Sequence, residues 1–166
     1  MSLSKDSIQN AINELETYKN SLQFKTSIYA QRLAEEGLKV IEARKNTYRG
    51  DADGNDLQTY VWLDYSGSTT TATLVLSGKD VAFIEFGAGI HYNTSVGSSL
   101  HPKGQELGMT IGSYGKGQGA NDSWVYYDEE LARFKTSHGT RAAMPMQGAD
   151  DTIKAKFFAI AKEVFG

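Results

Sequence analysis

The sequence predicts an α+β fold, in which a long N-terminal helix and a C-terminal helix pack on a small antiparallel sheet of about four strands. Three observations support this prediction. Apolar residues recur at helical spacing near both ends of the chain, an alternating pattern typical of strands lies between them, and a long glycine-rich stretch interrupts that pattern. The chain has 166 residues, the length of one ordinary domain, so we treat residues 1–166 as a single α+β domain.

The first predicted element is a helix over residues 4–45. No proline occurs there and no glycine precedes Gly37, while one stripe of apolar residues runs along it: Ile8, Ile12, Leu15, Leu22, Tyr29, Leu33 and Val40. Ser4 is a suitable N-cap. The stripe changes phase between residues 21 and 26, where we expect a break. Forty helical residues span about 60 Å, more than the width of a small core, so part of the stripe should face something else.

A β-hairpin is predicted over residues 58–76. Both arms are rich in Thr, Val, Tyr and Trp, and Ser66-Gly67-Ser68 between them has the chemistry of a turn. One face of the second arm is apolar and should pack under the long helix: Ala72, Leu74 and Leu76. The next segment, residues 81–86, fits a short helix that ends at Gly87, although a buried strand fits it nearly as well.

The second half of the chain begins with a long glycine-rich loop, residues 87–123, which has almost no periodicity. Loops of this length usually carry function or become ordered on a partner. Short strands are expected within residues 124–137, where they would complete the four-stranded sheet. Over residues 145–165 the helical spacing returns, with Pro145 at the start and lysines further on, which predicts the C-terminal helix. Phe157 lies in the middle of its apolar stripe and should therefore be buried.

Composition and charge exclude several classes of protein. The chain has no cysteine, which excludes disulfides, thiolate nucleophiles and cysteine-ligated zinc. Its 40% hydrophobic content lies outside the range of disordered chains, and its formal net charge of −3 gives no basic surface for binding nucleic acid. No apolar stretch approaches the ~20 residues of a membrane-spanning helix, and the N-terminus does not resemble a signal peptide. We therefore expect no membrane association.

Three histidines are the candidate metal ligands: His91, His101 and His138, with Asp122 or Glu106 as the fourth ligand. No pair of them has the helical or short-loop spacing by which a zinc site is recognised in a sequence. We interpret them as polar loop residues and expect no metal and no cofactor. Residues 115–119 are rich in glycine, but they lack the preceding strand and following helix that a phosphate-binding loop requires.

Glu85 lies between Ile84 and Phe86, so it could be a buried carboxylate that acts as a general base. A small hydrolase built around Glu85, His91 and His138 is therefore an alternative, and it requires these groups to converge in one pocket. No nucleophile or second acid accompanies Glu85, so we expect that the protein is not an enzyme. The sequon Asn93-Thr94-Ser95 is interpreted as a chance match.

Aromatic residues are concentrated in the predicted strands: Tyr60, Trp62, Tyr65, Trp124, Tyr126 and Tyr127. Successive residues of a strand point to opposite faces, so only about half of them can reach the core. The others would form an interface or protect the edges of the sheet. A monomeric protein-binding module is a further alternative.

Two segments resemble a known family. Residues 81–89, Val-Ala-Phe-Ile-Glu-Phe-Gly-Ala-Gly, are similar to the signature A-x-x-(V/I)-E-F-G-(T/A)-G, and residues 124–127 with residues 136–146 resemble a later block of the same family. The family is the tail-component group of long-tailed bacteriophages, which are the neck or tail-completion proteins of the head-to-tail junction. Its members begin with a long helix, carry an antiparallel sheet with a variable loop after the E-F-G motif, and end with a helix.

The resemblance implies a structural virion protein: a ring subunit at the neck of a phage or prophage that joins the DNA-filled head to the tail. The implied partners are further copies of the chain, head-closure or connector proteins, and tail-terminator or tail-tube proteins, with DNA only as passing cargo. The protein would lie in the virion, and in the host cytoplasm during assembly. The hypothetical partner interface comprises Glu85, Phe86, Gly87, Gly89, Tyr92, Tyr114, Trp124, Pro145 and Met146.

Overall fold

The computed structural model describes residues 4–113 and 117–166, so Tyr114 of the expected interface lies outside the described residues. The fold is α+β, as predicted, and its long helices span Lys5–Arg44 (α1) and Pro145–Phe165 (α3). The shorter elements are β1 (Arg49–Gly50), β2 (Gln58–Ser66), β3 (Thr69–Ser77), α2 (Val81–Phe86), the 3-10 turn η1 (Gln118–Ala120), β4 (Trp124–Asp128), β5 (Arg133–Ser137) and β6 (Thr140–Arg141). The predicted hairpin and both terminal helices are therefore confirmed, and residues 81–86 form the helix rather than the strand.

Helix α1 is one continuous helix of 40 residues, so the break expected between residues 21 and 26 is wrong. The Ser4 side chain caps it by accepting from the Ser7 amide (3.2 Å). Hydroxyl side chains at the end of the expected break and directly after it donate to backbone carbonyls one turn earlier, Thr26 to Leu22 O at 2.8 Å and Ser27 to Gln23 O at 3.1 Å. These polar residues therefore satisfy their own hydrogen bonds without interrupting the helix.

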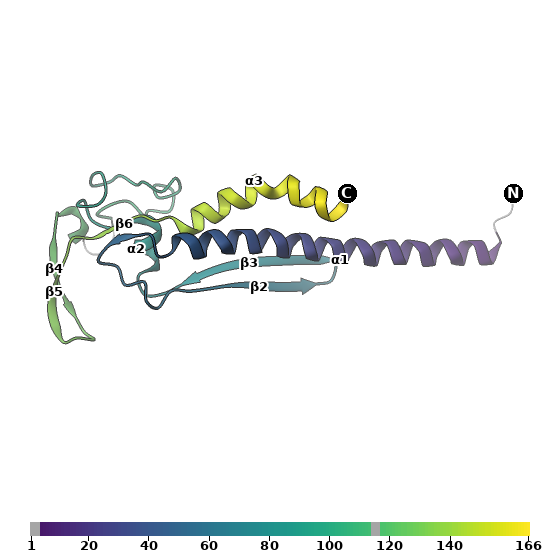
Figure 1. The fold of residues 1–166 in the computed structure, drawn as a ribbon, viewed down its shortest axis with the longest axis horizontal. Coiled ribbons are helices and arrows are strands. Elements are labelled where there is room, and N and C mark those ends of the chain that lie inside the picture. Colours follow the sequence, from purple (N-terminus) through teal and green to yellow (C-terminus); the bar gives the residue numbers. More distant parts are fainter. Residues whose placement is uncertain (1–3, 114–116) are drawn as a thin grey trace.

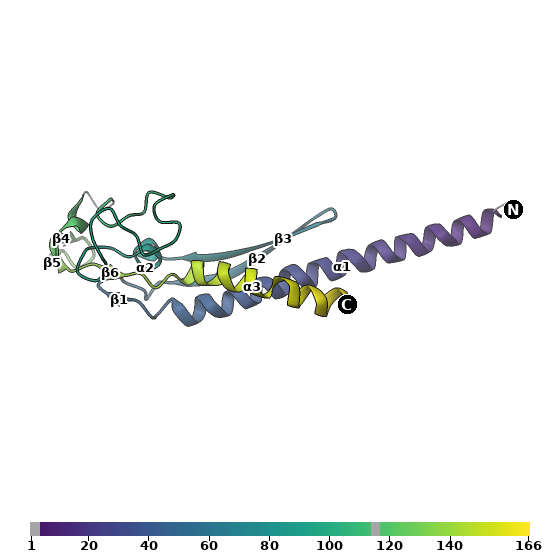
Figure 2. The same ribbon diagram turned by 90° about the horizontal axis from the view of Figure 1, so that it is seen from above.

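The core lies around the C-terminal half of α1, which packs against α3 on one side and against hairpin β2–β3 on another (Figures 1 and 2). Gly37 lies where side chains of α3 and β3 approach the backbone of α1 closely. A Cβ there would lie 2.8 Å from Ile153 Cδ1 of α3 and 3.0 Å from Leu74 Cδ1 of β3. Glycine therefore allows both side chains to contact the α1 backbone. The predicted inner face of β3 is confirmed, since Ala72 and Leu74 are less exposed than the threonines that alternate with them.

Polar contacts add to the α1–α3 packing. Lys156 of α3 and Lys39 of α1 both bind the carboxylate of Glu36. Hydrogen bonding from Lys156, and then from Lys39, lowers the pKa of Glu36 from 4.5 to about 2. Glu36 therefore remains charged even in mildly acidic solution, and its ion pair with Lys156 connects the two helices.

The expected four-stranded sheet is wrong, because the described strands form three separate two-stranded antiparallel sheets: β1–β6, β2–β3 and β4–β5. Hairpin β2–β3 runs along α1, whereas hairpin β4–β5 lies at the far end of the molecule (Figure 1). The long segment between the two hairpins carries the chain to that end, so β4 and β5 cannot pair with β2 or β3. Alternation in the sequence predicted the strands but carried no information about their partners.

The described part of residues 87–123 has little regular secondary structure, as predicted, but it is held by its own hydrogen bonds. Gly97 N donates to Ile111 O (2.8 Å) and Ile111 N donates to Ser98 O (2.7 Å). The Ile111 side chain is fully buried. This part of the loop therefore withdraws an apolar side chain from solvent and satisfies backbone groups within itself. Within the described residues, neither long helix is apolar enough to cross a membrane.

Candidate functional site

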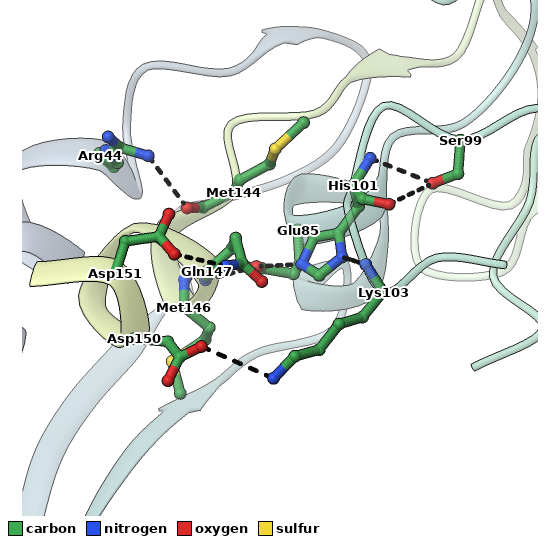
Figure 3. A network of polar contacts seen from close by, with 10 residues as sticks. All are labelled: Arg44, Glu85, Ser99, His101, Lys103, Met144, Met146, Gln147, Asp150 and Asp151. Atoms are coloured by element: carbon green, nitrogen blue, oxygen red, sulfur yellow. Dashed lines mark hydrogen bonds and ion pairs between the residues drawn. The ribbon is translucent and has the colours of Figure 1, made fainter. Parts of the chain in front are cut away.

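Glu85 is the centre of a buried polar network that joins three segments of the chain (Figure 3). Its Oε1 accepts from His101 Nε2 (3.0 Å) and from the Gln147 amide (2.9 Å), and its Oε2 accepts from the Met146 amide (2.8 Å). Glu85 comes from α2, His101 from the long loop, and the two amides from the first turn of α3. Since only 5% of Glu85 is exposed, these protein groups replace water around the carboxylate.

The hydrogen bonds of His101 fix the tautomer of its ring. The Lys103 amide donates to Nδ1 (3.1 Å), so Nδ1 is an acceptor and Nε2 carries the proton that is donated to Glu85. The Phe86 ring lies against the imidazole, with ring centroids 4.5 Å apart. His101 is therefore a buried structural histidine, and its role is to hold the loop against α2.

Glu85 also performs the work of an N-cap for α3. The residue at the cap position, Met144, has a left-handed backbone (φ 53°) and makes no side-chain cap hydrogen bond. The first amides of a helix have no partners within the helix and carry partial positive charge. The Glu85 carboxylate satisfies two of these amides from outside the helix. Its oxygens are thereby committed to structural contacts, which leaves little capacity for a general base.

The two segments that resemble the phage family meet in the structure. Ala88 and Thr140 exchange backbone hydrogen bonds of 2.8 and 2.7 Å, and Ala143 N donates to Ile84 O (2.8 Å). Gly139 has φ 88°, and a Cβ there would lie only 2.0 Å from Ala88 O. The close approach of these two backbones therefore requires glycine.

Asn93 completes this junction, and sequence reasoning missed its role. Its Nδ2 donates to three carbonyls, those of Ala88 (3.2 Å), Gly89 (2.8 Å) and Thr140 (3.0 Å). Among the described residues its buried Oδ1 has no hydrogen-bond partner, and a Cβ at Gly87 would lie 2.7 Å from that oxygen. The sequence pattern at Asn93 is the sequon, which indicates glycosylation and not a structural role.

His91 and His138 form a second, more exposed cluster. Their rings lie 5.3 Å apart, His91 Nδ1 contacts Asp122 Oδ1 (3.0 Å), and His138 Nδ1 lies 3.8 Å from Asp51 Oδ2. Glu85 is not among the partners of either histidine, so the three groups of the hydrolase hypothesis do not share hydrogen bonds. Within residues 4–113 and 117–166, no three His, Asp or Glu side chains are grouped so that they could hold a metal ion.

Removing divalent ions is expected to leave the stability of the protein unchanged, because the described residues offer no ligand set. Thermal unfolding followed with and without a chelator would measure this. A melting temperature that falls by several degrees and recovers with zinc would contradict the expectation and indicate the His91–His138 cluster as a metal site.

The other residues of the expected interface differ in exposure. Gly87, Gly89 and Pro145 are buried inside the chain, while Tyr92, Trp124 and Met146 are half-buried. Trp124 helps to line a hollow of about 860 Å³ between hairpin β4–β5 and the body of the protein. Acidic residues are frequent around this hollow: Asp51, Asp53, Asp80, Asp128, Glu129 and Glu130. Lys135 and Lys79 pair with Asp128 (2.6 Å) and Glu130 (3.1 Å), so part of this negative charge is neutralised within the chain.

No family model matches this chain, and no curated protein and no solved structure is similar enough to count as a match.

Proposed function

We propose that this protein is a structural virion subunit of a phage or prophage, which forms part of a neck or tail-completion ring and helps to join the filled head to the tail. The observation that carries the proposal is the amount of apolar surface that the chain leaves uncovered. Its partners would be further copies of itself and the adjoining head-closure or connector and tail-terminator or tail-tube proteins. DNA would pass through the ring as cargo.

The surface area of the chain is large for its size. Its accessible surface is 10789 Å² for a mass of 18.2 kDa. A compact monomer of this mass is expected to expose about 8,100 Å². The excess arises because the N-terminal half of α1 and hairpin β4–β5 extend away from the core (Figures 1 and 2). A subunit whose neighbours complete its packing would have this shape.

The uncovered surface is rich in large apolar side chains on several elements: Tyr60 and Trp62 on β2, Tyr127 and Phe134 on β4–β5, and Phe158 on α3. Trp62 is 67% exposed, Phe134 73% and Phe158 82%. Among the described strands, β2–β3 and β4–β5 pair only within their own hairpins, so their outer edges are able to pair with a strand of a neighbour. Exposed apolar residues in such numbers are typical of surfaces that bind other proteins.

The resemblance to phage neck proteins supplies the particular assembly, and the committed hydrogen bonds of Glu85 favour a structural role over hydrolysis. A monomeric protein-binding module would use the same aromatic surfaces. Measurement of the mass in solution separates that alternative from a ring subunit, because the module would remain a monomer.

Deletion of the gene from its phage or prophage is expected to block the joining of heads to tails. Filled heads and polymerised tails should both appear in the lysate, because other proteins package DNA and build the tail. Electron microscopy of the lysate would show separate heads and tails, and expression of the wild-type chain from a plasmid should restore joined particles. Normal joined particles in the deletion lysate would contradict the proposed function.

A further inference from the structure

The N-terminal half of α1 extends beyond the rest of the molecule (Figures 1 and 2). Every residue from 4 to 22 is exposed, and none of them contributes to the buried core. Many residues in this part are weak helix formers: Asn10, Asn13, Thr17, Asn20 and Ser21. Isolated helices of about this length are marginally stable in water even with better sequences. Packing against another element would therefore stabilise this part of α1.

The exposed half of α1 carries a heptad pattern on one face. Ile8, Leu15 and Leu22 occupy the a positions, and Ala11 and Tyr18 occupy the d positions. We call these five residues the seam. Its large side chains are strongly exposed: Ile8 47%, Leu15 68%, Tyr18 67% and Leu22 43%. The f positions on the opposite side hold Asn13 and Asn20, so the helix is amphipathic where the chain offers nothing for it to pack on.

The seam continues into an interface that is already formed. The next d position, Lys25, interrupts the apolar pattern, and the a and d positions that follow it are Tyr29, Arg32 and Glu36, all three of which contact α3. Tyr29 packs against Phe157 and Phe165 with ring centroids 5.5 and 5.7 Å apart, and Arg32 pairs with Glu163 at 2.5 Å. Helix α3 ends at Phe165. The same face of α1 is therefore covered by a helix up to the end of α3 and uncovered beyond it.

The charges beside the seam indicate which kind of helix would pack on it. Glu14 is at a g position and Lys19 at the following e position, and neither has an ion-pair partner in the described chain. In a parallel, in-register pair of identical helices, a g residue faces the next e residue of the partner, so Glu14 meets Lys19 of the second copy twice. An antiparallel pair would instead place g beside g and e beside e, which brings like charges together.

We propose that the N-terminal half of α1 is a self-association surface, on which a second copy of this chain packs its own α1 in parallel through the seam. This inference deepens the proposed function and rests on it, because the virion assembly is where two copies of the chain would meet. It names the surface and the orientation of the pair. Because the same seam of both copies meets, the contact is two-fold, and the further contacts that build a ring have to come from other exposed surfaces of the chain.

The first test measures the mass of the full chain by sedimentation velocity over a range of concentrations. The wild-type protein should associate as concentration rises, and the double variant Leu15→Ser/Leu22→Ser should weaken association at least about 100-fold, because two apolar contacts per helix are lost. The matched control, Asn13→Ser/Asn20→Ser, changes the opposite face and should associate like the wild type. Circular dichroism should show a folded body in both variants, since all four positions are exposed.

The second test determines orientation, and it uses the absence of native cysteine. Ala11→Cys places one thiol at a d position, so parallel in-register pairing should give a disulfide-linked dimer on mild oxidation. Asn13→Cys, on the outer face, should crosslink poorly. A charge test completes the set: Glu14→Lys should weaken association, and Glu14→Lys/Lys19→Glu should restore it.

Three results would overturn the inference: a wild-type chain that stays monomeric at all concentrations, an oligomer that survives the Leu15→Ser/Leu22→Ser change, or crosslinking of Asn13→Cys in preference to Ala11→Cys. Failure here is distinguishable from failure of the proposed function. An oligomer that is unaffected by the seam variants would contradict the self-association surface but not the proposed ring. Normal joined particles from the deletion phage would contradict the neck function, whether or not α1 self-associates.

Discussion

Replacing Glu85 with alanine is expected to destabilise the protein by roughly 3–5 kcal/mol, a large part of the total stability of a single domain. The carboxylate accepts from His101 Nε2 and from the amides of Met146 and Gln147, and it is 5% exposed. Its removal leaves three donors without an acceptor. Each buried unsatisfied group costs about 1–3 kcal/mol, and water that enters the space left by the side chain recovers part of that cost.

A conservative variant separates the roles of charge and shape. Glu85→Gln keeps the size of the side chain and one acceptor oxygen, but its amide nitrogen faces a donor. Its free energy of unfolding should therefore lie between those of the wild type and Glu85→Ala. Denaturant unfolding measures all three proteins. The control is Glu106→Ala, an exposed acid of the same loop, which should change stability by no more than about 0.5 kcal/mol.

Equal stability of Glu85→Ala and Glu106→Ala would contradict the structural role of the network. A Glu85→Gln protein that is as stable as the wild type but has lost its function in phage assembly would indicate a direct role for the charge. That result would also revive the general-base hypothesis, because it would separate the carboxylate from the fold.

The helices and the hairpin could be predicted because their signals are local. Apolar spacing, the Ser4 cap and Pro145 predicted the ends of α1 and α3 to within a few residues. The length of α1 also predicted that part of its apolar stripe would lie outside the core, but not that this would be the N-terminal part. By contrast, the pairing of the strands depends on where the loop of residues 87–123 carries the chain, and no local pattern contains that path.

Phe157 shows the limit of helical periodicity. It lies on the predicted stripe of α3, yet it is 45% exposed, so its prediction as a core residue is wrong. Helix α3 packs on α1 through Ile153 and Ile160, while the Phe157 ring meets Tyr29 at the edge of that interface. Periodicity identifies the face of a helix that is apolar. It does not tell how wide a surface the neighbouring element is able to cover.

The Glu85 network could be predicted only in part. A glutamate between Ile84 and Phe86 indicated a buried carboxylate, and the structure confirms its burial. Its partners lie 16 and about 61 residues further along the chain, at no spacing that a helix or strand would reveal. The interpretation of His101 as a polar loop residue is therefore wrong, because the residue is 6% exposed and its two ring nitrogens serve Glu85 and a backbone amide.

Replacing Ile41 with alanine is expected to cost about 2–5 kcal/mol, the usual range for an isoleucine in a closed core. Ile41 is fully buried in the C-terminal half of α1, one turn beyond the point where Gly37 contacts Ile153 and Leu74. The surrounding elements are held on two sides, by α3 and by hairpin β2–β3, so they are poorly able to close the cavity.

The same helix provides the matched control. Leu15→Ala removes a similar volume from the uncovered half of α1, where the side chain is 68% exposed. At concentrations low enough to keep the chain monomeric, this change should alter the free energy of unfolding by no more than about 0.5 kcal/mol. At higher concentrations the cost of Leu15→Ala should grow with association, because the seam is then buried against the second copy, whereas the cost of Ile41→Ala should hardly change. Equal costs for the two variants in dilute solution would contradict the division of α1 into a core half and an assembly half.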